Sequence, residues 1–341
     1  MKELQKYCSI LVIALLMVSC KNEPKFHTIQ GEAQGTTYAI KYIAKEELVS
    51  KRQIDSLLLA FDMSLSTYRN DSKISKINSG DTTVVVDDLF IKNWEISDEI
   101  YKATKGLFDP TIGVLVNAYG FGPNKTRQNP TSKQIDSLLQ YVGFDKVRIN
   151  ADNTVSKQHK DIYIDFNAIA QGYSVDVAVD FMKSKGIENA IVEIGGELYA
   201  FGKNTIENKN WIVGIDNPLQ KPEERTLIAK VNLENLGMAT SGNYRKVITD
   251  EESGEKFVHI INPKTGLAQK SNILSATILS KSAGIADGYA TAFMLMSLEE
   301  SKLFLQAHPE LYVMLLYSDS HNEMQQFITD NFSELIQSNS K

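Results

Sequence analysis

The sequence predicts an α+β protein built mainly from antiparallel sheet with helices packed against it. Segments with β-strand character cluster in the second half of the chain without helices between them, which favours antiparallel pairing over βαβ units. Segments with helical spacing of apolar residues precede and follow this cluster. The glycine-rich segments contain neither a GxGxxG pattern after a strand nor a GxxxxGK[ST] loop, so the sequence does not indicate either of those nucleotide-binding folds.

The composition is typical of a globular chain and shows no basic surface pattern for binding nucleic acid. The 341 residues include 36 basic and 42 acidic side chains, which gives a formal charge of −6. No basic stripe is interleaved with aromatic residues, so nucleic acid is excluded as a partner. From residue 31 onward the chain has no low-complexity linker, no second apolar span and no fixed repeat. We therefore expect one compact unit over residues 31–341.

The first residues predict an export signal. Lys2 and Lys6 precede an apolar run over residues 10–18, which is far short of the ~20 residues that span a bilayer. The run ends in MVSC, which resembles a bacterial lipobox with Cys20 as the lipidated residue. We expect a signal peptide over residues 1–19 and a polar linker over residues 20–30. The alternative is an ordinary signal peptide with an incidental cysteine.

The cysteine count limits the chemistry of the mature domain. Cys8 and Cys20 are the only cysteines, and both lie in the leader. The remaining chain therefore has no thiol, which excludes disulfides, cysteine nucleophiles and thiolate metal sites.

The first half of the chain shows two expected strand–helix pairs. We expect strands over residues 37–43 and 82–86, the second on account of its β-branched side chains. We expect helices over residues 46–65 and 89–106, with Gly106 as a C-cap. The first helix has apolar residues near helical spacing, namely Leu48, Ile54, Leu57, Leu58 and Phe61.

The second half of the chain is richer in expected strands. A half-buried strand over residues 161–166 precedes a helix over residues 172–186. Further strands are expected over residues 190–194, 211–216, 227–233, 246–249, 257–261 and 275–280. A helix over residues 283–298, a short helix over residues 299–307 and a strand over residues 311–317 close the chain.

Eight patches of glycine, small and hydroxyl residues lie between these elements. Each patch alone is typical of a tight turn. They read QGTTYAI, GLFDPTIG, YGFGP, DFNAIAQGYSVD, VEIGGE, GMATSGNYR, HIINPKTG and ADGYATA. Together and in this order they resemble the motifs of the ApbE family of FAD:protein FMN transferases, from about Gln34 to Met296. The patterns FDPTIGxLVN, VEIGGEL, ATSGNYR and HIINPKTG carry the resemblance.

The resemblance implies a T-fold-like, two-lobed architecture and a specific reaction. FMN would pass from FAD to a Thr or Ser hydroxyl of a target protein, with AMP as the leaving group and Mg²⁺ as a cofactor. The target would be a redox protein outside the cytoplasm with an exposed acceptor motif, such as a subunit of an ion-translocating electron-transfer complex. With the leader, this predicts a protein anchored by lipid to a bacterial membrane and facing the periplasm.

The segment ADGYAT offers oxygen ligands for a metal ion. Asp287 and Thr291 stand four residues apart on an expected helix, so they project from one face. Such hard oxygen donors suit Mg²⁺, which takes few protein ligands and fills its octahedron with water and phosphate oxygens. The resemblance adds the backbone carbonyl of Ala168. Alternatively, Thr291 bonds to a helix carbonyl and Asp287 is solvated. Ala290 stands where some relatives carry a second Asp.

The resemblance also assigns residues that contact FAD. These are Gln34, Tyr68, Gly106, Leu107, Phe108, Asp165, Gln171 and Ile261. Two of them have structural alternatives. Asp165 could cap the following helix, and Tyr68 could be a core residue.

Three residues are candidates for catalysis. Asp287 would act through the metal. His259 could orient or deprotonate the attacking hydroxyl, or it could be a structural histidine in a turn. Arg245 could stabilise phosphate charge, or it could pair with a surface carboxylate.

Two other functions remain open. The same site could hydrolyse FAD to FMN and AMP, with water as the acceptor. A different class is an exported lipoprotein that stores FAD without chemistry. Asp287 and Thr291 favour catalysis over storage, because storage needs no metal.

Overall fold

The centre of the molecule is an eight-stranded antiparallel sheet. The computed structural model describes residues 23–123, 130–220, 226–242, 247–249, 256–258, 260–268 and 271–337. The strand order in the sheet is β1-β2-β5-β6-β9-β12-β13-β14, and every neighbouring pair is antiparallel. The strands are β1 Lys25–Ala33, β2 Thr36–Ala44, β5 Ala190–Ile194, β6 Glu197–Phe201, β9 Leu236–Gly242, β12 Ile273–Ser280, β13 Tyr312–Ser318 and β14 Met324–Ile328.

Within the described residues, three two-stranded ribbons accompany this sheet. They pair β3 Val147–Ile149 with β4 Val155–Lys157, β7 Trp211–Asp216 with β8 Leu227–Leu233, and β10 Val247–Thr249 with β11 Lys256–Val258. Each ribbon is antiparallel. The predicted α+β class with mainly antiparallel sheet is therefore confirmed.

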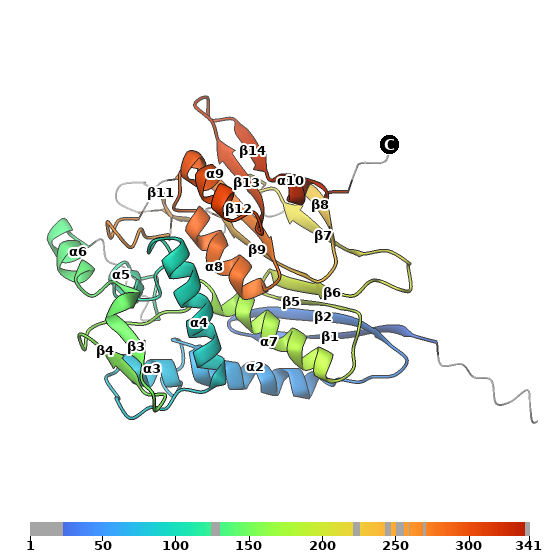
Figure 1. Cartoon of the computed structure of the whole chain (residues 1–341), viewed down its shortest axis with the longest axis horizontal. Helices are drawn as coiled ribbons and strands as arrows, with labels where there is room; N and C mark the ends of the chain where they lie inside the picture. Colours follow the sequence, from blue (N-terminus) through green and yellow to red (C-terminus); the bar gives the residue numbers. More distant parts are fainter. Residues whose placement is uncertain are drawn as a thin grey trace, which may run out of the picture.

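The long helices cover one face of the large sheet, as Figure 1 shows, whereas Phe332 packs with the β7–β8 ribbon on the other face. The long helices are α2 Lys51–Leu65, α4 Asp88–Ala103, α7 Ala170–Ser184, α8 Ala283–Phe293 and α9 Leu298–Ala307. The short ones are α3 Lys73–Asn78, α5 Gly113–Ala118, α6 Ser132–Leu139, the 3₁₀ turn Phe144–Lys146 and α10 Asp330–Ser333. None of the helices in the described ranges has the length and apolarity needed to cross a membrane.

The strands alternate their side chains between two apolar layers. On β12, Ile278 packs in the layer with α4 and α8, whereas its neighbour Leu279 packs with the β7–β8 ribbon on the opposite face. On β2, Ile40 packs with α2 and α7, and Ile43 packs on the ribbon side. This period of two is the expected consequence of strand geometry and leaves both faces of the sheet covered.

Side-chain caps determine where several helices begin. Asp87 precedes α4 and accepts a hydrogen bond from the Phe90 N–H at 3.0 Å. Ser50 precedes α2 and forms a capping box with Gln53. The cap explains why the first helix begins at Lys51 and not at residue 46 as predicted.

Two predicted strands are wrong. Residues 82–86 form only an isolated bridge, between Val85 and Thr154. Residues 161–166 likewise contribute one bridge, from Tyr163 to Ile112. β-branched composition does not make a strand where no neighbouring backbone completes a ladder.

Other predicted boundaries shift. The helix predicted over residues 283–298 ends at Phe293, because a short turn and the Ser297 cap of α9 follow. The strand predicted over residues 257–261 corresponds to β11, which ends at Val258. Strand β1 was not predicted, and it begins at Lys25, inside the segment expected as a linker.

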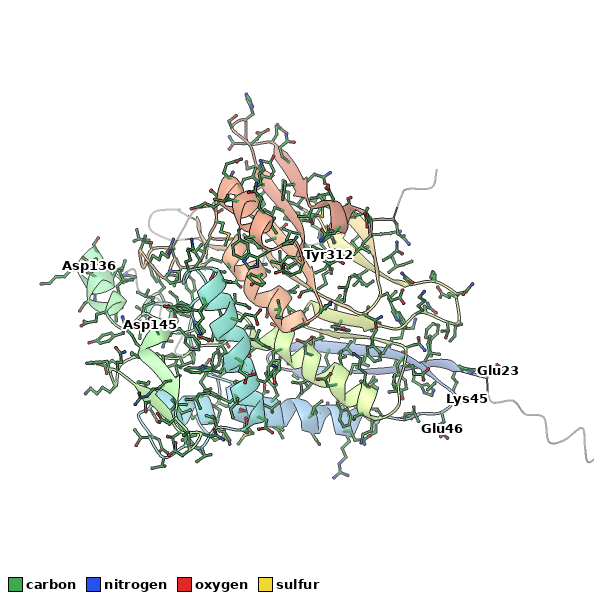
Figure 2. All side chains as sticks on the ribbon, viewed as in Figure 1. Glu23, Lys45, Glu46, Asp136, Asp145 and Tyr312 are labelled. Carbon is green, nitrogen blue, oxygen red and sulfur yellow. The ribbon has the colours of Figure 1, made fainter. Side chains whose placement is uncertain are left out.

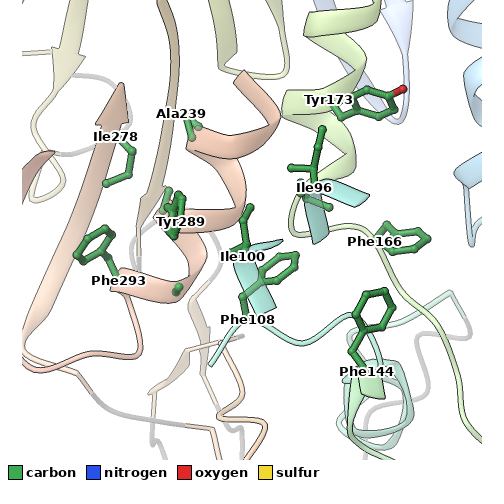
Figure 3. Packing of buried hydrophobic residues seen from close by; sticks show 14 of the residues in the cluster. Ile96, Ile100, Phe108, Phe144, Phe166, Tyr173, Ala239, Ile278, Tyr289 and Phe293 are labelled. Carbon is green, nitrogen blue, oxygen red and sulfur yellow. The ribbon is translucent and has the colours of Figure 1, made fainter. Parts of the chain in front are cut away.

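Helix α8 is enclosed by the rest of the protein. Nine of its residues are buried, and most of them are small: Ala283, Gly284, Ala286, Asp287, Gly288, Tyr289, Ala290, Ala292 and Phe293. A Cβ on Gly288 of α8 would lie 2.5 Å from Ile100 of α4 and 3.6 Å from Phe108 of the loop after α4, two side chains that Figure 3 shows beside α8. The small side chains let α4, α7, β9 and β12 approach α8 closely.

Helix α7 fixes the N-terminus of α8 through one carboxylate. Asp176 accepts hydrogen bonds from the Ser282 hydroxyl at 2.6 Å and from the N–H groups of Ala283 at 2.8 Å and Gly284 at 2.9 Å. Burial raises the pKa of Asp176 to about 6, although these three donors oppose the shift. This contact sets the position of α8 along α7.

The approach of α7 to α8 depends on Gly172. A Cβ at this position would lie 2.7 Å from the Cβ of Asp287 and would overlap the backbone of Ala283. We predict that Gly172→Ala lowers the free energy of unfolding by about 1–3 kcal/mol, which corresponds to a fall in melting temperature on the order of 5 °C. Ser184→Ala, at the exposed end of α7, is the control. Equal melting temperatures for both variants and the parent would contradict this packing argument.

Candidate active site

The site is built around a buried carboxyl group on α8. The Asp287 side chain is 7% exposed, and its Oδ2 accepts a hydrogen bond from the Gly172 N–H at 3.0 Å. Burial raises the pKa of Asp287 well above its usual value, and the negative charge of Glu197 raises it further. A bound cation would stabilise the ionised form of this carboxyl.

Glu197 was not singled out from the sequence, although it lies in the VEIGGEL motif. It is the first residue of β6 and is 7% exposed. It follows Gly195 and Gly196, which have φ values of 65° and 108° and allow the tight turn from β5. A carboxylate directly after such a glycine pair is the signal that could have indicated it. The turn places this second acidic group within electrostatic reach of Asp287.

Gln171 lies against the same turn. Its Nε2 donates to the Ile194 carbonyl oxygen at 3.3 Å, and a Cβ on Gly195 would overlap this amide. Gln171 directly precedes Gly172, the donor to Asp287. The structure therefore brings these two predicted site residues to neighbouring positions.

Gln34 joins the first hairpin to α7. It occupies the turn between β1 and β2 with φ of 56°, a left-handed conformation that is uncommon for residues other than glycine. Its Oε1 accepts a hydrogen bond from the Ser174 hydroxyl at 3.1 Å. Ser174 is three residues after Gln171 on α7, so Gln34 belongs to the same region.

Asp165 is a second buried carboxyl group. It is 6% exposed, and its Oδ1 accepts from the Asn167 N–H at 2.8 Å. Burial raises its pKa to about 6 against the effect of the Asn167 hydrogen bonds. The alternative that Asp165 caps α7 is wrong, because Ile169 holds the N-cap position and no side chain caps this helix.

Tyr68 is a surface residue, so the alternative that it belongs to the core is wrong. Its side chain is 56% exposed. Burial of part of the ring raises its pKa, and the charge of Asp165 raises it further, which places the two side chains near each other. An exposed ring beside a buried carboxyl can provide a flat face to a ligand.

The three residues of the loop Gly106 to Phe108 differ in how far they are buried. Gly106 has φ of 79°. Leu107 is half-buried, and Phe108 is 3% exposed in the core (Figure 3). A Cβ on Gly288 would meet the Phe108 ring at 3.6 Å, so this side chain packs on α8 next to Asp287. Phe108 is therefore available to a ligand mainly through its carbonyl oxygen, since its N–H donates to the Thr104 hydroxyl at 3.1 Å.

Hydroxyl and carboxyl groups of the FDPT motif organise this loop. The Asp109 Oδ1 accepts from the Thr111 N–H at 2.8 Å and from its hydroxyl at 2.6 Å. The Thr111 Oγ1 accepts in turn from the Gly143 N–H at 2.6 Å. Burial raises the pKa of Asp109 to about 6. These contacts are structural and hold the loop in place.

The structure brings only some of the remaining predicted residues close to Asp287. Ala168 and Thr291 are half-buried, and Thr291 lies one turn after Asp287 on α8. Ile261 is 5% exposed in a separate apolar cluster with Leu115 and Ile135. His259 and Arg245 lie outside the described residues.

No three His, Cys, Asp or Glu side chains of the described ranges gather into a metal-binding cluster. A divalent ion at Asp287 would therefore rely on hydroxyl and carbonyl oxygens and on ligands from outside the chain. The arrangement defines a class: an α+β protein with a buried carboxyl group on a central helix and a second buried carboxyl group, Asp165, beside an exposed aromatic residue, Tyr68.

Comparison with known proteins identifies the family. The model of the ApbE family matches residues 34–315. FAD:protein FMN transferase of Haemophilus influenzae is 33% identical over 328 residues, which are 93% of each chain. The enzyme of the same name from Vibrio cholerae is 33% identical over 324 residues, or 91% of this chain and 93% of that one.

Solved structures agree with these relatives. The flavin transferase ApbE from Vibrio cholerae superposes with a TM-score of 0.80 at 30% identity, over 92% of this chain and 99% of that one. The flavinyl transferase ApbE of Pseudomonas stutzeri gives a TM-score of 0.80 at 26% identity, over 92% and 97%. The chain belongs to the ApbE family.

The raised pKa of Asp165 predicts a pH-dependent effect on stability. In the folded protein this pKa is about 6, above the ordinary 3.8. The contribution of the Asp165 carboxyl to the free energy of unfolding is therefore fully present below about pH 4 and is lost as the pH rises through 6. The loss at pH 8 is roughly 3 kcal/mol. We predict that Asp165→Asn melts at a higher temperature than the parent at pH 8, with a smaller difference at pH 4. Asp136→Asn, at an exposed position, is the control; the same pH trend there would contradict the assignment.

Proposed function

We propose that this chain transfers FMN from FAD to a Thr or Ser hydroxyl of a target protein and releases AMP. The matches to transferases of this name over more than nine tenths of each chain support the reaction. The structural observation that carries the proposal is Asp287, a buried carboxyl group on a rigid central helix.

The reaction is a displacement at phosphorus. The hydroxyl oxygen of the target forms a bond to the FMN phosphorus of FAD. The bond from that phosphorus to the bridging oxygen breaks, and AMP leaves with this oxygen and its electron pair. The proton of the hydroxyl passes to a base. Positioning and charge neutralisation dominate such reactions.

We assign Mg²⁺ to the Asp287 carboxylate, the Thr291 hydroxyl and the Ala168 carbonyl. The raised pKa of Asp287 fits this role, because its buried carboxylate faces the charge of Glu197 and gains from a nearby cation. When bound, Mg²⁺ would neutralise charge on the pyrophosphate. The Gly172 N–H orients the carboxylate by its hydrogen bond to Oδ2.

The flavin donor would be held by residues around this centre. We assign FAD contacts to Tyr68, whose exposed ring lies near Asp165, and to the side chains of Gln34, Asp165, Gln171 and Ile261. The loop Gly106, Leu107 and Phe108 would contribute mainly backbone carbonyl oxygens, because its N–H groups already donate to Tyr101 and Thr104. His259 and Arg245 remain candidates for base and phosphate-binding roles.

Hydrolysis of FAD is the second candidate, since water could replace the protein hydroxyl at the same site. Dependence of flavin transfer on an acceptor protein separates the two reactions. Storage of FAD without chemistry is disfavoured, because binding alone gives no reason to bury a carboxyl group whose pKa is raised this far.

We further propose export and a lipid anchor at Cys20, facing the periplasm. Figure 2 places Glu23, the first described residue, at one end of the molecule next to Lys45, and Asp136 of α6 at the opposite end. An anchor before Glu23 would therefore attach at the β1–β2 end of the sheet. Acceptors would be redox proteins at the same membrane.

Replacement of Cys20 tests the anchor. We predict that Cys20→Ser leaves the melting temperature of the domain unchanged and releases the protein from the membrane, because the lipid would be lost. Fractionation with a high-salt wash is the measurement, and Ser19→Ala is the control. Retention of Cys20→Ser in the washed membrane would exclude the lipoprotein assignment.

Replacement of Asp287 tests the metal site. We predict that Asp287→Asn keeps FAD binding, because the amide oxygen can still accept from Gly172, and that it loses AMP release by at least about tenfold. Raising Mg²⁺ should restore part of the rate by mass action. AMP release across a Mg²⁺ titration is the measurement, with Asp136→Asn as the control.

Two results would contradict the metal assignment. One is a parental rate in a folded Asp287→Asn variant. The other is a parental rate that chelator does not change.

A further inference from the structure

A cavity of about 700 Å³ lies beside the proposed FAD loop, near the end of α8. Its walls come from the end of α4, from α9 and from the loop that holds Lys264. The larger apolar side chains of its lining are Leu107, Met296, Leu303 and Phe304. None of these side chains except Leu107 belongs to the site described above.

The cavity combines this apolar lining with exposed cationic side chains. Lys105 and Lys264 both line it. One acidic residue, Glu300, lines it as well: its Oε2 accepts from the Ser297 N–H at 2.7 Å in the cap of α9, which lowers its pKa, and the charge of Lys264 helps to lower this pKa further. The two lysines still leave the lining with an excess of positive charge. The lining therefore favours a ligand that has an apolar group next to a negative charge.

The α9 wall is formed before any ligand arrives. The Phe304 ring stacks on His308 at 4.2 Å and contacts Tyr289 of α8 at 5.7 Å between ring centroids. Leu303, next to it, is 68% exposed. A rigid aromatic residue beside an exposed leucine provides an anchor pocket that needs little reorganisation.

We infer that this cavity docks the acceptor protein, through an extended segment next to its Thr or Ser that carries an apolar and an acidic side chain. The inference rests on the proposed function, since only a transferase needs a second macromolecular substrate. The position of the cavity supports this inference. Leu107 lines the cavity, and the next residue, Phe108, packs on Gly288, the neighbour of Asp287. A segment bound here lies against the loop assigned to FAD.

Substitutions at Leu303 test the docking site. Leu303→Glu removes the apolar contact and adds a charge that repels an acidic segment, whereas Leu303→Lys removes the contact but adds an attractive charge. Leu59→Glu is the matched control, because Leu59 is 52% exposed on the distant helix α2. Thermal melting confirms that each variant is folded.

The acceptor probe is the membrane fraction of cells that lack the gene, whose acceptor sites carry no flavin from this enzyme. Covalent flavin is measured by gel fluorescence at several dilutions of membrane, and AMP release is measured without membrane. We expect Leu303→Glu to need about tenfold more membrane for the same rate, or about 1.4 kcal/mol. Leu303→Lys should lie between it and the parent. AMP release to water should stay unchanged.

Three outcomes would overturn the inference. Equal membrane dependence of Leu303→Glu and Leu59→Glu would show that the cavity does not bind the acceptor. A higher FAD requirement for AMP release in Leu303→Glu would assign the cavity to FAD. A parent that releases AMP but labels no protein would overturn the proposed function and the docking site together.

Discussion

The contact between α7 and α8 is the constraint on which the site depends. Gly172 has no side chain, so its N–H can reach the Asp287 carboxylate at 3.0 Å across the helix interface. Asp176, one turn further along α7, binds the first N–H groups of α8 and fixes the register of the two helices. Because the Gly172 contact is buried and the Asp176 contact is half-buried, the position of the Asp287 carboxylate is set by packing and not by solvent.

This constraint also explains the electrostatics of the site. Asp287 and Glu197 are buried acidic groups and Asp176 is a half-buried one close to them, and the pKa of Asp287 is raised by burial and by both neighbours. Burying like charges in this way costs folding free energy, which is offset by the apolar packing around α8. A cation at Asp287 would relieve the repulsion, which links metal binding to both stability and catalysis.

The sequence predicted what depends on local pattern. The strand patterns predicted the bounds of β5, β7 and β8 correctly. Helical spacing predicted the bounds of α4 and α7 to within a few residues. The sequence failed at residues 82–86, where β-branched side chains have no ladder partner. It also overlooked Asp176 and Glu197, because their roles arise from contacts with residues about 90–110 positions away in the chain. The family motifs supplied the site residues, but only the packing shows which of them surround Asp287.

The most direct test of this account is whether the protein attaches FMN to another protein. Purified protein would be incubated with FAD, Mg²⁺ and membranes from cells that lack the gene, and denatured proteins would be separated to measure covalent flavin alongside free AMP. The account predicts a fluorescent protein band that forms with AMP in equal amounts and disappears with chelator. Formation of AMP and free FMN without a labelled protein, at saturating Mg²⁺, would contradict it.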